Sequence, residues 1–416
     1  MPVLPSFAKI NLGLKIGPAR PDGFHELRTV YQTLALHDVI RVDVVAGEGI
    51  EIRCSDPRVP LDASNTCYKI AERVLALVKE QQIPREPKSV RDDSSKKKPF
   101  GALEGAPLQD DILEDDRSQG GMIQGGVPGT AVAAKQQGID THLYGTAHAA
   151  RVQHEIQQGA RGRIVIEIEK RLPVQGGMGA ASSNAVATML AMERALSVKL
   201  SPENKLRIAA EVGSDLPLFL IGGTVLGVGR GEEVFPLPDL PTMHVVVVTP
   251  PVGVSTPRAF ARWDELNTLE GALTGSPATG TISEFSQRVF AWLGAGFPQV
   301  GRAEFSERTP TASGVPARGG NRAETPLLDL VRAGIENDFE KVVFPEYPDL
   351  REVKAILLRE GASYASLSGS GSTLYGLFET QDQAQAAADR MSAAGHSAVA
   401  TTTLSRDEYR KAATSD

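Results

Sequence analysis

The chain has 416 residues, of which 41% are hydrophobic, and its formal net charge is −7. This length allows two domains with cores of their own, and the acidic balance excludes a broad basic surface for nucleic acid. The two cysteines, Cys54 and Cys67, form neither a disulfide framework nor a metal-binding cluster, and no apolar run approaches a membrane span in length. We therefore expect a cytoplasmic protein without nucleic-acid or membrane partners.

The first predicted strand covers Ile10 to Ile16, where apolar residues alternate with polar or small ones. Lys9 and Asn11 share the opposite face of that strand, so an ammonium group and a carboxamide can converge on one ligand. An ordinary solvated face is the alternative interpretation.

The turn signal Pro21-Asp-Gly23 presents Phe24 and His25 directly after it. An aromatic ring beside an imidazole can stack on a nucleobase and hydrogen-bond to it, and the alternative is a packed ring next to a surface histidine. Short strands are predicted from Val39 to Val45 and from Gly49 to Arg53.

Asn65 precedes an apolar helical pattern that continues to Val78, which predicts a helix with Asn65 as its N-cap. From about 87 to 162 the chain has runs of charged residues and paired glycines, with scarcely any periodicity. We interpret this stretch as a low-complexity insertion.

A glycine-rich loop lies between an alternating run, Ile164 to Glu169, and a helical pattern that includes Val186. The glycines within Gly176 to Gly179 let backbone N–H groups approach a ligand, and Ser182 and Ser183 stand at the expected helix N-terminus. A phosphate suits such a place. The alternative is a plain turn with capping serines. The spacing matches neither a Walker loop nor the dinucleotide-binding fingerprint.

Ser201-Pro202 predicts the start of a helix, and Gly213 predicts its end. Asp215 follows, either as a cap or as a partly buried carboxylate that serves as a base near the phosphate site. Strands are predicted from Thr224 to Val228 and from His244 to Thr249.

The proline-rich seam from Phe235 to Pro241 is the predicted boundary between a domain of residues 1–240 and one of residues 241–416. Thr256-Pro257 opens a helix in the second domain. The stretch at about 302–326 is rich in small residues and proline and is interpreted as an irregular insertion.

The remainder predicts an α+β set that closes an antiparallel sheet. Between two of its strands, Ser368-Gly-Ser-Gly-Ser372 forms a second loop rich in hydrogen-bond donors. A simple hairpin turn is the alternative interpretation.

Together, three stretches resemble in chain order the signature motifs of the GHMP small-molecule kinases. They are Ser6-Phe-Ala-Lys-Ile-Asn-Leu12, the loop from Pro173 to Ala185, and Leu367-Ser-Gly-Ser-Gly-Ser-Thr373. Four further motifs are similar to those of members that act on a cytidyl-diphosphate sugar alcohol: Asp22-Gly-Phe-His25, Gly213-Ser-Asp-Leu-Pro-Leu-Phe219, Gly229-Arg-Gly-Glu232 and Glu336-Asn-Asp-Phe-Glu340.

The resemblance implies an α+β fold of two domains, an N-terminal ribosomal-protein-S5-domain-2-like domain that binds the nucleotide and a C-terminal ferredoxin-like α/β sandwich. It implies ATP-dependent phosphorylation of the sugar alcohol in the non-mevalonate isoprenoid pathway, by a monomer or weak homodimer, with Mg²⁺ carried in by the nucleotide. The alternatives are a kinase for mevalonate, phosphomevalonate or homoserine, whose substrates have no base to stack, and a non-catalytic binding protein on the same fold. Retention of both Lys9 and Asp215 argues against the latter.

The resemblance also implies roles for residues on the substrate side. Asp215 would be the base toward the hydroxyl, and Lys9 would orient that hydroxyl and offset charge developing on the phosphoryl group. Asn11 would hold the sugar alcohol, Phe24 and His25 would receive the cytosine, and Thr256 matches a further substrate-side position.

On the nucleotide side, the resemblance places Asn65 near the adenine. The residues that would wrap the ATP phosphates are Pro173, Val174, Gln175, Gly176, Gly177, Met178, Gly179, Ala180, Ala181, Ser182 and Ser183. Gln175, Ala180 and Ala181 stand where these kinases usually have glycine, so a backbone with positive φ there would be strained.

Overall fold

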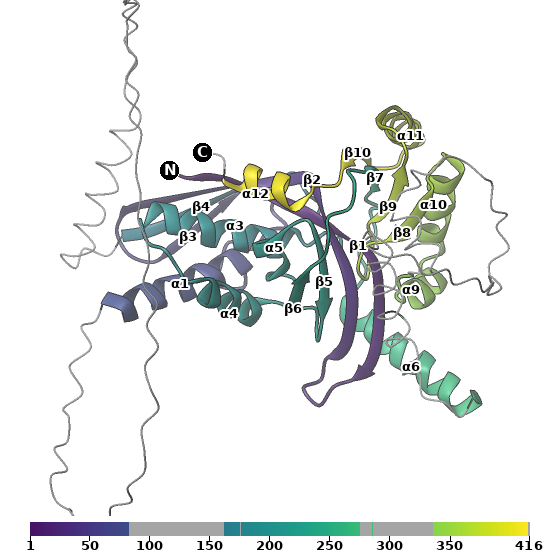
Figure 1. Ribbon diagram of the computed structural model, residues 1–416, viewed down its shortest axis with the longest axis horizontal. Coiled ribbons are helices and arrows are strands. Elements are labelled where there is room, and N and C mark those ends of the chain that lie inside the picture. Colours follow the sequence, from purple (N-terminus) through teal and green to yellow (C-terminus); the bar gives the residue numbers. More distant parts are fainter. Residues whose placement is uncertain (83–161, 175, 275–284, 286–335, 415–416) are drawn as a thin grey trace, which may run out of the picture.

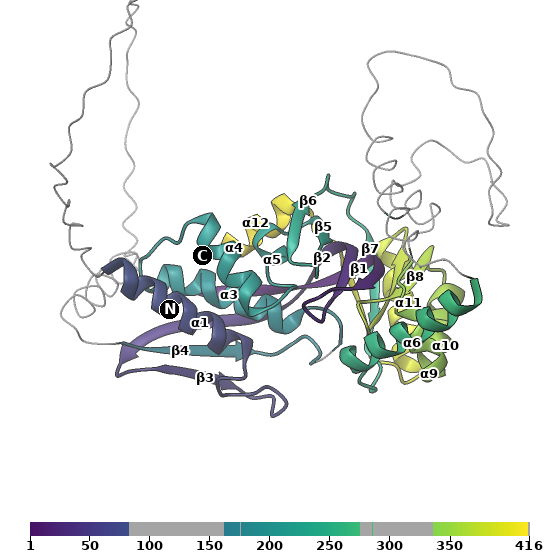
Figure 2. The ribbon, with the colours of Figure 1, turned by 90° about the horizontal axis from the view of Figure 1, so that it is seen from below.

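The structure is a computed structural model that describes residues 1–82, 162–174, 176–274, 285 and 336–414. These residues form two helix-covered sheets, and the long strands β1 and β2 of the first sheet extend toward the second (Figures 1 and 2). Apart from Gly162, the predicted insertions lie outside the described residues. The domain boundary near residue 240 stays a prediction.

The first sheet has six strands: β1 (Val3–Ala19), β2 (His25–Ala46), β3 (Ile50–Cys54), β4 (Gly162–Glu169), β5 (Thr224–Val228) and β6 (Glu233–Pro236). Their order is β3-β4-β2-β5-β6, and β1 pairs antiparallel with β2 beside this path. The helices of this half are α1 (Thr66–Gln82), α3 (Ala180–Ala195), α4 (Pro202–Val212) and α5 (Leu218–Ile221). Helix α3 packs on β1 and β2, and α1 lies between α3 and α4.

The second sheet has four antiparallel strands in the order β10-β7-β9-β8, which confirms the predicted antiparallel arrangement. They are β7 (His244–Val248), β8 (Tyr364–Leu367), β9 (Leu374–Phe378) and β10 (Ala398–Thr402). The helices are α6 (Thr256–Thr274), α9 (Glu340–Glu346), α10 (Pro348–Arg359), α11 (Gln381–Ala393) and α12 (Arg406–Thr414). Helices α10 and α11 pack on this sheet, whereas α12 returns to lie over the first sheet (Figure 1).

The two sheets are joined by a hydrophobic cluster in which Ile10 and Leu12 of β1 belong with Val245 and Val247 of β7. Because strand side chains alternate, Lys9 and Asn11 occupy the other face of β1. That face is also covered, since the two residues are only 3% and 2% exposed. The solvated-face alternative is therefore wrong.

The long strands were only partly predicted. β1 extends beyond the predicted Ile10 to Ile16, and the predicted strand from Val39 to Val45 is the second half of the 22-residue β2. Residues 29–34 of β2 are all buried, so this segment lacks the hydrophobic alternation that marks a one-sided strand.

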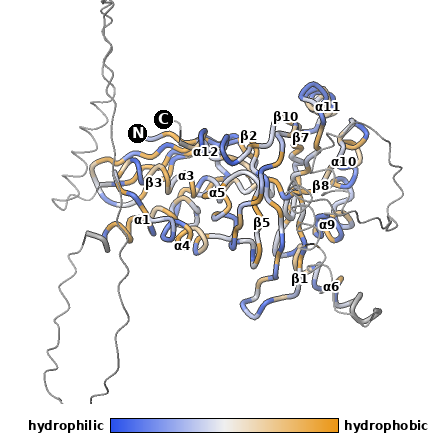
Figure 3. The backbone as a smooth tube through the Cα atoms, viewed as in Figure 1, coloured by the Kyte–Doolittle hydropathy of each residue, from blue (hydrophilic) through white to orange (hydrophobic). Residues whose placement is uncertain are grey.

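By hydropathy, the tip of the β1–β2 hairpin and α11 are mostly hydrophilic (Figure 3).

Helix ends with local signals were predicted correctly. Ser201 caps α4 by accepting a hydrogen bond from the backbone N–H of Asn204, and Gly213 is the C-cap. Asn65 caps α1, because its Oδ1 accepts from the N–H of Cys67 at 2.8 Å. Among the described residues no helix is both long and apolar enough to cross a membrane.

A buried carboxylate, Asp38 of β2, fixes the chain on both sides of the glycine-rich loop. Its Oδ2 lies 2.6 Å from the Lys170 ammonium and accepts from Asn184 Nδ2 at 3.0 Å. Its Oδ1 accepts from the backbone N–H groups of Arg171 and Leu172 at 2.7 and 2.6 Å. The end of β4 and the first turns of α3 are therefore held by one side chain.

We predict that Asp38→Ala lowers the free energy of unfolding by about 3–5 kcal/mol, because it leaves the Lys170 ammonium buried without its counter-ion. Denaturant unfolding measures this. Glu51→Ala is the control: it removes partly exposed ion pairs with Arg53 and Arg163 and should cost less than about 1 kcal/mol. Equal effects of the two substitutions would contradict the role given to Asp38.

Candidate functional site

The side chains of Lys9 and Asp215 are in contact, although the two residues are far apart in sequence. Two residues that act in one site must lie close together in this way. Lys9 Nζ lies 3.4 Å from Asp215 Oδ2 and donates to Asn11 Oδ1 at 2.7 Å. The Asp215 side chain is 33% exposed and the Lys9 side chain 4%, so a ligand reaches the pair from the carboxylate side. One ammonium N–H group is thereby directed at Asn11, and an ammonium has two further donors that can serve Asp215 and a ligand.

Tyr31 of β2 completes this group, and the sequence analysis missed it. Its hydroxyl donates to Asp215 Oδ1 at 3.0 Å, while Lys9 Nζ lies 5.5 Å from its ring centroid. Burial raises the pKa of Tyr31 well above its ordinary value, and the neighbouring Asp215 carboxylate adds to the rise. Tyr31 is therefore a neutral donor that fixes one oxygen of the carboxylate.

Asn11 is held beside this group from the β2 side. Its Nδ2 donates to Thr29 Oγ1 at 2.8 Å, and the Thr29 hydroxyl in turn donates to the carbonyl of Gly13. The Tyr375 hydroxyl donates to the backbone carbonyl of Asn11 at 2.9 Å. The carboxamide is therefore fixed in orientation next to Lys9.

The glycine-rich loop leads directly into α3. Gly177 and Gly179 have φ values of +78° and +68°, and Gly179 is the N-cap without any side-chain cap. The capping-serine alternative is wrong, because Ser183 lies within the helix and its hydroxyl contacts Ser6 Oγ at 2.8 Å. The first N–H groups of α3 therefore have no intrahelical acceptor and can bind an anion.

Ala180 and Ala181, which stand where the resembling kinases usually have glycine, fit the local backbone without strain. Ala180 and Ala181 are the first residues of α3, and helical backbone carries no penalty for a Cβ. The expected strain is therefore absent at these two positions. Gln175 lies outside the described residues.

The loop after β8, Ser368 to Ser372, packs against the glycine-rich loop. It does connect two hairpin strands, as the simpler interpretation held, but it also contacts the site. Ser368 Oγ donates to the carbonyl of Gly177 at 2.9 Å, and the N–H of Thr373 donates to the carbonyl of Gly176 at 3.1 Å. A methyl group at Gly369 would lie 3.7 Å from Lys9 Nζ. Both loops therefore border the Lys9 ammonium.

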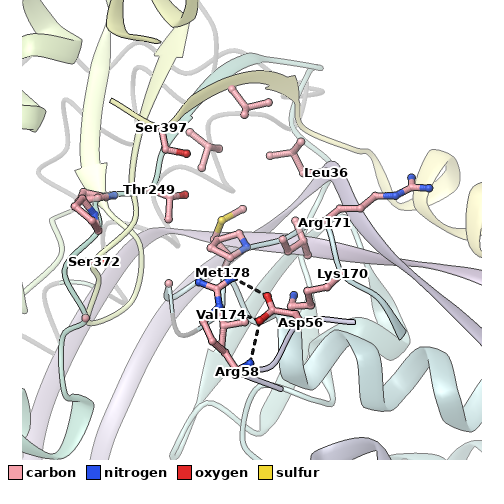
Figure 4. A pocket seen from close by; sticks show the side chains of 18 of the residues that line it. Leu36, Asp56, Arg58, Lys170, Arg171, Val174, Met178, Thr249, Ser372 and Ser397 are labelled. Atoms are coloured by element: carbon pink, nitrogen blue, oxygen red, sulfur yellow. Dashed lines mark hydrogen bonds and ion pairs between the residues drawn. The ribbon is translucent and has the colours of Figure 1, made fainter. Parts of the chain in front are cut away.

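Two clefts flank the glycine-rich loop. One is lined by Asn65 and by the loop and first turn of α3 from Pro173 to Ser182, apart from Gln175. The other, of about 660 Å³, is shown in Figure 4, where Thr249, Ser372 and Ser397 lie across from the Arg58–Asp56 ion pair. The first cleft contains all the described residues expected on the nucleotide side except Ser183, which is buried. The described residues contain no group of three His, Cys, Asp or Glu that could hold a metal ion.

Phe24 and His25 lie in different surroundings. Phe24 is 50% exposed, with the Arg230 guanidinium 4.9 Å from its ring centroid. His25 is buried, stacks on Phe260 of α6 at 4.8 Å, and contacts Asp264 through Nε2 at 2.7 Å. The surface-histidine alternative is wrong. Phe260 and Asp264 were missed because only the fold brings α6 to this strand.

Thr256, at the start of α6, is connected to the second loop. Its hydroxyl lies 2.7 Å from Ser370 Oγ. This contact joins α6, which carries Phe260, to the loop that borders Lys9. The base-binding candidates and the catalytic candidates therefore belong to one connected set of elements.

Comparison with known proteins identifies relatives that cover most of the chain. Residues 142–223 match the family profile of the GHMP kinases N terminal domain, and residues 323–397 match that of the GHMP kinases C terminal. The chain is 30% identical over 380 residues to 4-diphosphocytidyl-2-C-methyl-D-erythritol kinase of Solibacter usitatus (strain Ellin6076), which covers 91% of this chain and 82% of the relative.

Solved structures share the fold. A crystal structure of 4-(cytidine 5'-diphospho)-2C-methyl-D-erythritol kinase superposes with a TM-score of 0.55 at 22% identity, covering 97% of this chain and 99% of that one. The crystal structure of L. major mevalonate kinase in complex with R-mevalonate superposes with a TM-score of 0.52 at 11% identity. The match covers 97% of this chain and 96% of that one. The expected α+β fold of two sheets is confirmed, and fold alone does not separate these substrates.

We predict that Gly177→Ala disrupts the contact between the two loops, because the added methyl group would overlap the carbonyl oxygen of Ser368. Gly49→Ala is the matched control, since Gly49 also has positive φ but has no atom near the added methyl. Both should lose about 1 kcal/mol to backbone strain, and Gly177→Ala should lose clearly more in thermal unfolding. Equal losses would contradict the close approach.

Proposed function

The chain belongs to the GHMP kinases, and we propose that it transfers the γ-phosphoryl group of ATP to the 2-hydroxyl of 4-diphosphocytidyl-2-C-methyl-D-erythritol. The products would be the 2-phosphate and ADP, formed in the non-mevalonate route to isopentenyl diphosphate. The relatives support this substrate, and the spacing of the site carries the proposal.

The nucleotide would occupy the cleft between Asn65 and the start of α3. Its phosphates would meet the free N–H groups at the helix N-terminus, where the dipole favours negative charge. Asn65 would border the adenine mainly through its backbone and position, because its side chain already bonds the N–H of Cys67 and the carbonyl of Pro60. Mg²⁺ would arrive bound to the nucleotide and offset phosphate charge.

Asp215 would accept the proton of the substrate hydroxyl. Tyr31 and Lys9 hold its two oxygens, and its partial exposure leaves room for the hydroxyl. The remaining N–H of Lys9 would contact the transferring phosphoryl group or the hydroxyl, where it offsets developing negative charge. Asn11 would orient the sugar alcohol from the adjacent strand position.

The distance along β2 from His25 to Tyr31 favours a long substrate. His25 and Tyr31 are six residues apart on the same strand and face, which corresponds to roughly 20 Å. A nucleoside diphosphate joined to a sugar alcohol spans such a distance, with its base at Phe24, His25 and Phe260. Mevalonate and homoserine are too short to reach from Asp215 to these aromatic rings.

An ADP-release assay tests the assignment. The cytidyl substrate should support turnover, whereas mevalonate, phosphomevalonate and homoserine should not. Turnover with one of the latter would identify a different GHMP substrate, and ATP binding without any turnover would identify a non-catalytic protein.

We predict that Asp215→Asn lowers kcat by about 10²–10⁴-fold with little change in ATP affinity, because a general base acts on the chemical step. Lys9→Ala should also lower kcat more than it weakens substrate binding. Tyr31→Phe should cost about three- to tenfold in kcat, since one hydrogen bond to the carboxylate is lost. Normal turnover of the Asp215 variant would refute the mechanism.

At the base end, Phe24→Ala, His25→Ala and Phe260→Ala should each raise KM for the cytidyl substrate about tenfold and leave KM for ATP unchanged. Phe24→Tyr should be tolerated. Phe235→Ala removes a similarly exposed ring from β6 and serves as the control. If the three alanine variants instead weaken ATP binding, the cytidyl assignment fails.

A further inference from the structure

His25, the first residue of β2, is held by two side chains of α6, and the kinase reaction proposed above gives no role to one of them, Asp264. Nε2 of His25 lies 2.7 Å from Asp264 Oδ1. The imidazole also stacks on Phe260 at 4.8 Å, with an angle of 11° between the two planes. Phe260 and Asp264 are four residues apart on α6, so they lie on the same face of the helix. One helix face therefore contacts both the plane of the imidazole and its edge.

These contacts fix the orientation of the imidazole. Phe260 packs edge-on against the buried ring of Phe339, at 5.0 Å and 73°, so the ring on which His25 stacks is itself supported. A half-turn of the imidazole about its Cβ–Cγ bond would keep the stacking but would carry Nε2 away from Asp264. The contact with Asp264 therefore selects one of the two orientations that stacking allows.

The same contact determines which ring nitrogen carries the proton. An ionised carboxylate can only accept a hydrogen bond, so Nε2–H of His25 must be the donor to Asp264. In the neutral imidazole, Nδ1 is then unprotonated and is an acceptor. Within the part of the chain that the structure describes, Nδ1 of His25 forms no hydrogen bond. Nδ1 is therefore the ring nitrogen left for a ligand.

We propose that Asp264 is a positioning residue that makes the base site select cytosine over uracil. This inference rests on the proposed function, which places the base at His25. The exocyclic amino group of cytosine donates hydrogen bonds, which suits an unprotonated Nδ1. Uracil has a carbonyl oxygen at that position, so two acceptors would face each other. A site that pairs with the amino group of one base is left unpaired by the other, and this difference discriminates between them.

Asp264→Asn tests this role with little change of shape. The Asp264 side chain is 53% exposed, so the substitution disturbs no core packing. A carboxamide can accept from Nε2–H of His25, as the carboxylate does, or donate to an unprotonated Nε2. In the second case the proton moves to Nδ1, which then donates to the carbonyl of uracil. The variant should therefore change the ratio of the two affinities, whereas loss of a purely structural contact would weaken both bases equally.

Nitrogen NMR of the full chain, labelled with ¹⁵N-histidine, measures the tautomer of His25 without any ligand. His25→Gln identifies its resonances. The unaltered chain should show a protonated Nε2 and an unprotonated Nδ1, and Asp264→Asn should show a larger share of the ring protonated at Nδ1. Glu265→Gln is the control, because it removes the neighbouring carboxylate of α6, which pairs with Arg262. The spectrum of this control should match that of the unaltered chain.

Isothermal titration with cytidine 5′-diphosphate and uridine 5′-diphosphate measures the selectivity, with ADP present to saturate the nucleotide cleft. The cytidine compound should bind about tenfold more tightly than the uridine compound, and Asp264→Asn should reduce this ratio to about twofold. Glu265→Gln should keep the full ratio.

Three results would overturn the proposal: His25 of the unaltered chain carries its proton at Nδ1 or at both nitrogens, the unaltered chain does not prefer the cytidine compound, or Asp264→Asn keeps the full preference. Neither measurement requires turnover. Failure of the proposed kinase reaction is reported separately, by the ADP-release assay.

Discussion

The close approach of two backbone loops is the constraint on which the site depends. The carbonyls of Gly176 and Gly177 accept hydrogen bonds from Thr373 and Ser368 across the junction of the two sheets. A side chain at 177 would fill this contact, so it exists only because glycine stands there. Lys9 lies at the same junction, where its backbone N–H donates to the backbone carbonyl of Met178. The phosphate-binding candidates and the catalytic candidates are therefore positioned by a single contact.

A buried polar side chain fixes the backbone at the glycine-rich loop, and another fixes the backbone of the loop from Ser368 to Ser372. Asp38 holds the stem of the first loop, as described above. Asn337 holds the second, because its Nδ2 donates to the carbonyls of Leu367 and Gly369 at 2.8 Å each. The adjacent Asp338 pairs with Lys15 of β1 at 3.0 Å. Buried groups of this kind are costly when a partner is lost, so they specify one arrangement of the loops.

The parts of this molecule that the sequence predicted are those with local or chemical signals. The ends of α4 follow from Ser201 and Gly213. The catalytic roles of Lys9 and Asp215 stay a prediction, although the two side chains are in contact, and both residues were named from residue type and motif. Tyr31 was not, because its partner Asp215 is 184 residues away and a tyrosine in a strand is ordinary. The contact of His25 with Asp264 spans 239 residues and was missed for the same reason. The length of β2 was also missed, since burial on both faces removes the alternation on which strand prediction relies.

The same separations affect how the protein folds. The hydrogen bond from Tyr375 to the carbonyl of Asn11 joins residues 364 positions apart, and the bond from Lys15 to Asp338 spans 323. Contacts between residues so far apart in sequence form late in folding, because a large loop must close before any of these contacts can stabilise the fold. During synthesis β1 leaves the ribosome long before β9. Its two buried lysines, Lys9 and Lys15, are therefore made before Asp215 and Asp338, with which they pair in the folded protein. We therefore expect the yield of folded protein to depend on the rate of chain elongation and on chaperones that shield this strand.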